Sequence, residues 1–106
     1  MFEKLAEVEL LYEELERRIS DPDLVNDMDE YRRVHKQYSE LTEVVAKYRQ
    51  YKNTAQQIDD TEQMLRGALD DDMRDLAQME FDDLKEQRAA LELELQVMLL
   101  PKDPND

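Results

Sequence analysis

The chain has 106 residues, 40% of them charged, and a formal net charge of −14 at pH 7. It contains one glycine, three prolines, one histidine and no cysteine. These counts exclude disulfides and thiolate metal sites. A glycine-rich nucleotide loop, a histidine-based metal site and a catalytic triad also lack the residues they need. The acidic surplus disfavours nonspecific nucleic-acid binding, and no apolar run approaches the ~20 residues of a membrane span.

The first predicted helix ends at Ser20-Asp21-Pro22, because the residue before a proline avoids the α region. Glutamates four residues before arginines predict the ion pairs Glu13–Arg17 and Glu14–Arg18. Residues 22–26 predict one short helical turn. The apolar residues recur at intervals of three and four, which is typical of an amphipathic helix: Leu5, Val8, Tyr12, Leu15 and Ile19.

The second predicted helix covers residues 27–66 and is ~60 Å long at 1.5 Å per residue. Asp27 and Glu30 predict a reciprocal capping box at its start, and Gly67 predicts a glycine cap at its end. Its apolar stripe shifts where Val45, Tyr48 and Tyr51 follow at two successive intervals of three. A stripe that rotates in this way predicts one partner along the first half of the helix and another along the second. The stripe comprises Tyr31, Val34, Tyr38, Leu41, Val45, Tyr48, Tyr51, Ala55, Ile58 and Leu65.

The third predicted helix begins after Asp70-Asp71-Asp72, where a helix N-terminus favours negative charge, and stops before Pro101. The sequence therefore predicts an all-α fold of three main antiparallel helices. The second and third form a long coiled-coil-like hairpin, and the first packs alongside. The core stripe of the third helix comprises Ala77, Phe81, Leu84, Arg88, Leu91, Leu95 and Met98. A second apolar face comprises Ala90, Leu93, Val97 and Leu100.

The last eight residues carry a resemblance to a known family: Leu99-Leu100-Pro101-Lys102-Asp103-Pro104-Asn105-Asp106. This peptide resembles the junction between the first and second domains of bacterial class-1 peptide chain release factors, of the type that reads UAA and UAG. The resemblance covers the whole chain from Met1. Further matching segments are Ser20-Asp21-Pro22-Asp23, Tyr31-Arg32 and Val45-Ala46-Lys47-Tyr48-Arg49.

The resemblance implies that residues 1–100 are the N-terminal helical domain of such a factor and that residues 101–106 begin a linker. Family members enter the ribosomal A site and trigger peptidyl-tRNA hydrolysis through a Gly-Gly-Gln loop, and a Pro-x-Thr tripeptide helps to read the codon. Neither motif occurs in this chain, so no catalytic residue is assigned. We expect no enzyme activity, cofactor, metal or small-molecule ligand.

The partners that the resemblance implies are the stalk base of the large ribosomal subunit, both protein and rRNA, and the class-2 release factor GTPase. The expected location is the cytoplasm, without membrane association. One alternative is a stand-alone coiled-coil adaptor or tether. A second is a tRNA-gripping helical hairpin, which the net charge of −14 disfavours.

One candidate contact face lies on the second helix, where four basic residues point away from the apolar stripe: Arg32, Arg33, Lys36 and Lys47. This face could meet phosphate groups. Asp29, Glu40 and Glu43 share the same arc, however, and predict ion pairs four residues apart with Arg33, Lys36 and Lys47. A phosphate contact and a solvated mixed face therefore both remain open.

Other titratable residues predict structural roles. His35 has no second histidine or cysteine to complete a metal site or a triad. Acidic pairs such as Asp71/Asp75 and Asp82/Glu86 lie on a convex helix face, whereas paired catalytic carboxylates must converge in a cleft. The run Asp70–Asp72 lacks the glycine and glutamate of a calcium loop, so a helix cap is the better interpretation.

Overall fold

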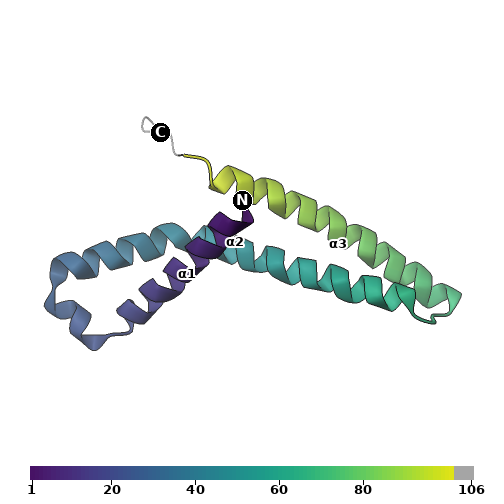
Figure 1. Cartoon of the computed structure of the whole chain (residues 1–106), viewed down its shortest axis with the longest axis horizontal. Helices are drawn as coiled ribbons and strands as arrows, with labels where there is room; N and C mark the ends of the chain where they lie inside the picture. Colours follow the sequence, from purple (N-terminus) through teal and green to yellow (C-terminus); the bar gives the residue numbers. More distant parts are fainter. Residues whose placement is uncertain (102–106) are drawn as a thin grey trace. The chain divides into compact units, whose positions relative to one another are not determined.

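The structure is a computed structural model that describes residues 1–101. Its elements are α1 (Phe2–Ile19), the 3-10 helix η1 (Pro22–Asn26), α2 (Met28–Arg66) and α3 (Asp71–Met98), as Figure 1 shows. No strand occurs among these residues, which confirms the predicted all-α fold. Residues 102–106, which make up most of the predicted linker and the end of the terminal peptide, lie outside the described residues.

The chain divides into two compact units, Met1–Ala46 and Lys47–Asp106, here called unit 1 and unit 2. Helix α2 is continuous, with its first half in unit 1 and its second half in unit 2. The boundary falls where the apolar stripe was predicted to rotate, between Val45 and Tyr48. A helix whose apolar face changes direction buries different faces against different partners. The prediction that the two halves of α2 have separate partners is therefore confirmed.

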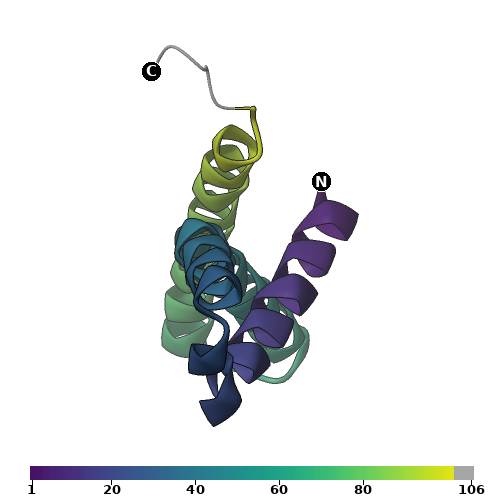
Figure 2. The same ribbon diagram turned by 90° about the vertical axis from the view of Figure 1, so that its left-hand side faces the viewer.

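Unit 1 is a helical pair with its own apolar core. The segment η1 connects the end of α1 to the start of α2 (Figure 2), and α1 and the first half of α2 run in opposite directions (Figure 1). The rings of Tyr12 and Tyr38 stack between the two helices, with centroids 4.5 Å apart. The core cluster consists of buried Leu15, Leu24 and Val34, with Ile19, Tyr31, Tyr38 and Leu41 packed against it.

The turn in unit 1 is built from aspartate caps. Asp21 accepts a hydrogen bond from the Asp23 backbone N–H at 2.9 Å, and Asp27 accepts one from the Glu30 N–H at 3.1 Å. The predicted capping box is only half formed. The Asp27 N–H donates instead to the carbonyl of Leu24 at 3.1 Å, and the Glu30 carboxylate is engaged by two arginines. The reciprocal half of the box was therefore a wrong prediction.

Unit 2 is the predicted hairpin of the second half of α2 and α3, which lie side by side and antiparallel in Figure 1. The buried residues of α3 confirm its predicted stripe: Ala77, Leu84, Leu91 and Leu95. Two polar residues of α2, Thr54 and Thr61, are also buried, at 5% and 6% exposure. They lie seven residues apart on the face that carries Ile58, and the sequence pattern did not identify them because they are polar.

The turn between α2 and α3 is closed by side chains. Asp70 caps α3 by accepting from the Met73 N–H at 2.8 Å, as predicted. The Arg74 guanidinium donates to the carbonyls of Leu65 at 2.8 Å and Gly67 at 3.0 Å. Gly67 was expected to cap the end of α2, a position where glycine usually adopts a left-handed conformation, but it has no positive φ. Arg74 supplies hydrogen bonds to carbonyls at the end of α2, so a left-handed cap is not needed.

The predicted second apolar face is exposed within the described part of the chain, and its last member, Leu100, lies just beyond the end of α3. Leu93, Val97 and Leu100 are each about two thirds exposed, at 64%, 66% and 65%. No helix formed by residues 1–101 has both the length and the apolar character needed to cross a membrane.

Candidate partner-contact surface

The four basic residues singled out on α2 fall into both units. Arg32, Arg33 and Lys36 lie in unit 1, whereas Lys47 lies in unit 2 and is partly buried. Within residues 1–101, neither Arg32 nor Lys36 takes part in an ion pair. The predicted pair between Lys36 and Glu40 is therefore not formed, and these two cations remain available to a partner.

Arg33 is held by neighbours on its own helix. Its Nε donates to Glu30 at 3.0 Å, and its Nη1 donates to Gln37 at 3.3 Å. The prediction that Asp29 would pair with Arg33 was wrong. Glu30 is the better partner because Arg18 of α1 also binds its carboxylate, which fixes the acceptor between two guanidinium groups.

Ion pairing in α1 also differs from prediction. Arg17 pairs with Glu14 at 2.5 Å, three residues away, rather than with Glu13. Arg18 pairs across unit 1 with Glu30 rather than with Glu14. Spacing on a helix allows either partner at three or four residues, so packing against α2 decides which pair forms.

Lys47 belongs to the hairpin of unit 2. Its ammonium group pairs with Glu94 of α3 at 2.7 Å, and its side chain is 28% exposed. One helical turn further, the Tyr51 hydroxyl donates to Glu92 at 3.4 Å. Burial raises the pKa of Tyr51, and the Glu92 carboxylate raises it further. The predicted pair of Lys47 with Glu43 was wrong, since α3 offers a carboxylate across the hairpin.

The double pairing of Glu30 predicts a pH dependence. Hydrogen bonds from Arg33 and Arg18 hold the pKa of Glu30 at about 2, below its ordinary 4.5. Because the folded pKa is lowered, this stabilisation is present above about pH 4.5 and is lost as pH falls toward 2. We expect the difference in unfolding midpoint between the native chain and Glu30→Gln to shrink over this range in denaturant titrations. A difference that stays constant with pH would contradict the pairing.

The other candidate residues, His35 and the acidic pairs of α3, do not form part of a metal site in the described residues. The His35 ring lies against the Tyr31 ring, with centroids 4.3 Å apart. Residues 1–101 contain no group of three histidine, cysteine, aspartate or glutamate side chains able to hold a metal ion. Asp71, Asp75, Asp82 and Glu86 are all exposed on α3.

These features define the class of the protein: an all-α module that presents two exposed basic side chains, Arg32 and Lys36, on α2. The PCRF domain model matches residues 8–106. The chain belongs to the PCRF domain family.

Curated relatives carry the name "Peptide chain release factor 1". The protein from Carboxydothermus hydrogenoformans is 49% identical over 106 residues, and that from Desulforudis audaxviator is 48% identical over 106. The protein from Alkaliphilus oremlandii is 44% identical over 107. Each match covers 100% of this chain and 30% of the relative. The comparison with solved structures found no match. The resemblance to class-1 release factors is thus confirmed.

Proposed function

We propose that this chain is the ribosome- and partner-contact domain of a class-1 release factor that acts at UAA and UAG codons. The observation that carries this proposal is 49% identity, across the whole chain, to a protein named Peptide chain release factor 1. A stand-alone coiled-coil adaptor would not account for a family match over residues 8–106. The chain spans about 30% of the length of these relatives, so peptide release itself is proposed for the complete factor.

The proposed division of labour follows from the residues present. Peptidyl-tRNA hydrolysis is assigned to a Gly-Gly-Gln loop, and this chain has one glycine. Residues 1–100 therefore serve as a positioning domain, and residues 101–106 begin the linker to the rest of the factor. The proposed partners are protein and rRNA of the stalk base and the class-2 release factor GTPase, in the cytoplasm.

The first test is a peptide-release assay with the chain alone. Ribosomes programmed with UAA and loaded with labelled peptidyl-tRNA are mixed with the purified chain, and free peptide is measured. We expect release no faster than without factor, because the chain carries no Gly-Gly-Gln sequence. A complete relative, such as the Carboxydothermus protein, is the positive control. Release by the chain alone would contradict a contact role without chemistry.

The second test concerns Arg32 and Lys36. We propose that these two cations bind rRNA phosphates, because both lie on the outer face of α2 without an ion pair in residues 1–101. In a complete factor, Arg32→Glu with Lys36→Glu should weaken binding to stop-codon ribosomes. The slope of log affinity against log salt should fall by about one for each phosphate that the protein no longer neutralises.

The matched control for this double variant is Lys4→Glu with Lys85→Glu, which changes the net charge equally at two exposed positions. This control should bind as the native factor does. Stability should change little in either variant, because none of the four residues forms an ion pair in residues 1–101 and the contact of Lys85 with the exposed side of the Phe81 ring contributes only about 0.5–1 kcal/mol. If the Arg32/Lys36 titrations superimpose on those of the native factor at every salt concentration, the face is merely solvated and α2 serves there as scaffold.

A further inference from the structure

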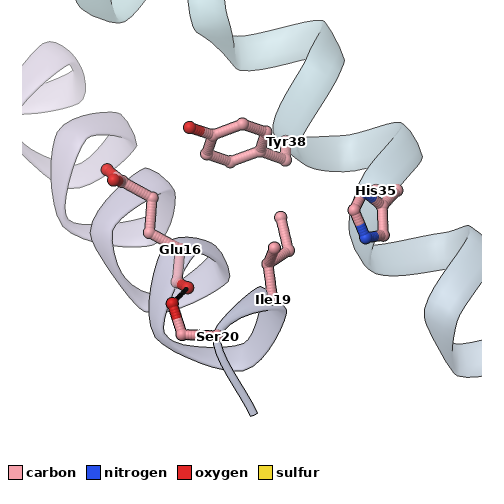
Figure 3. A pocket seen from close by; sticks show the side chains of 5 residues that line it. All are labelled: Glu16, Ile19, Ser20, His35 and Tyr38. Atoms are coloured by element: carbon pink, nitrogen blue, oxygen red, sulfur yellow. Dashed lines mark hydrogen bonds between the residues drawn. The ribbon is translucent and has the colours of Figure 1, made fainter. Parts of the chain in front are cut away.

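Unit 1 contains a pocket of about 210 Å³ between α1 and α2, shown in Figure 3. Sites for cofactors and small-molecule ligands usually measure about 300–1,000 Å³, so this volume suits a single long side chain better than a whole ligand. The lining residues are Glu16, Ile19 and Ser20 from the end of α1, and His35 and Tyr38 from α2.

The walls of the pocket are held by ring contacts. The Tyr38 ring is stacked on Tyr12 at 4.5 Å, and the His35 ring is tilted against Tyr31 at 4.3 Å. In Figure 3 the Ile19 side chain points toward the space between Tyr38 and His35. Two ring surfaces and an aliphatic group thus line a pocket whose shape is set by neighbouring aromatic residues.

The electrostatics of the pocket favour a cation. The three α1 residues belong to or directly follow its last turn, where helix carbonyls carry partial negative charge. The Glu16 carboxylate adds a full negative charge and has no ion pair within residues 1–101. The two arginines of this turn are engaged elsewhere, Arg17 with Glu14 and Arg18 with Glu30.

We propose that this pocket binds an arginine side chain presented by a partner protein. A guanidinium group is planar, so it stacks on aromatic faces while its N–H groups donate to a carboxylate. A lysine ammonium group matches the charge but lacks the flat surface. Charge complementarity extends beyond the pocket, because the chain carries 28 acidic and 14 basic residues. The inference rests on unit 1 alone and does not depend on the proposed function.

The test is an NMR titration of the complete 106-residue chain with the tripeptide N-acetyl-Gly-Arg-Gly-amide at physiological salt. We expect saturable shifts confined to the backbone amides of Ile19, Ser20, His35, Tyr38 and their chain neighbours. The same peptide with lysine, and with the neutral isostere citrulline, gives two comparison arms. We expect both to bind more weakly, citrulline the most, because it keeps the planar shape without the charge.

Two charge-reversal variants distinguish binding in the pocket from nonspecific attraction of a cationic peptide to an acidic protein. Glu16→Lys should abolish the saturable shifts, whereas Glu7→Lys, an equal change at an exposed position of the same helix, should retain them. Circular dichroism checks that both variants keep their helix content, and Glu16→Gln provides a milder replacement if Glu16→Lys loses structure. Absence of saturable shifts would overturn the proposal. Equal binding of the lysine peptide, or equal weakening by Glu7→Lys, would overturn it as well.

Discussion

Leu84→Ala is expected to lower the free energy of unfolding by about 2–5 kcal/mol, because it removes a leucine side chain from the buried interface between α2 and α3. Leu84 is 4% exposed, and it lies on the same face of α3 as buried Ala77 and Leu91. The space left by the missing atoms cannot be filled without moving one helix against the other. Urea unfolding followed by helical circular dichroism measures the change.

The matched control is Leu93→Ala, the same substitution nine residues further along α3. Leu93 is 64% exposed, so its removal should change the free energy of unfolding by no more than about 0.5 kcal/mol. Similar losses at Leu84 and Leu93 would mean that the helical register of the hairpin is wrong. The comparison therefore tests which face of α3 is buried, and not only whether the chain tolerates alanine.

Val34→Asp should destabilise unit 1 by about 3 kcal/mol or more, because it places an unpaired carboxylate in an apolar core. Val34 has 0% exposure and packs with Leu15 and Leu24, which come from α1 and η1. A substitution on α2 should therefore loosen the other two elements of the unit. Hydrogen exchange of amides in α1 and η1 reports this directly, and we expect protection in both to fall together.

Val25→Asp is the control for that experiment, since Val25 lies in η1 of the same unit and is 56% exposed. Its carboxylate remains in water, so stability should change by no more than about 0.5 kcal/mol. If Val34→Asp and Val25→Asp left α1 equally protected, the core assigned to unit 1 would be wrong.

Local sequence signals were sufficient for the helices themselves. Intervals of three and four placed Leu5, Tyr12 and Leu15 of α1 in the core, and Pro22 and Asp70 marked a helix end and a helix start. The two successive intervals of three in α2 also located the boundary between the units. These features depend on residues within one or two turns of each other, which is why the chain alone reveals them.

Pairing across helices was not predictable in the same way. Arg18 binds Glu30, and Lys47 binds Glu94, 47 positions away, although each had an acidic neighbour on its own helix at suitable spacing. Choice among such partners depends on how two helices pack, which spacing along one helix does not encode. Thr54 and Thr61 were missed for a related reason, since their burial follows from the hairpin and not from their polarity.

The sequence predicted a basic face of four residues, but within the described part of the chain only two of the four lack an ion pair. Arg33 and Lys47 have carboxylate partners, whereas Arg32 and Lys36 have no ion pair in residues 1–101. The pocket between α1 and α2 gave no signal in the sequence. Its lining combines residues from two helices, and only their packing brings Glu16 near Tyr38.

We propose that this chain positions a release factor and contributes no chemistry of its own. The most direct measurement uses a chimera in which the chain replaces the matching 106 residues of the Carboxydothermus factor, beside a variant of that factor lacking them. Peptide release from UAA-programmed ribosomes is followed over a range of factor concentrations. We expect the chimera to restore the half-saturating concentration of the intact factor. We expect the deletion to raise this concentration while leaving the saturating rate nearly unchanged. A deletion that lowers the saturating rate and leaves the half-saturating concentration unaltered would contradict a positioning role.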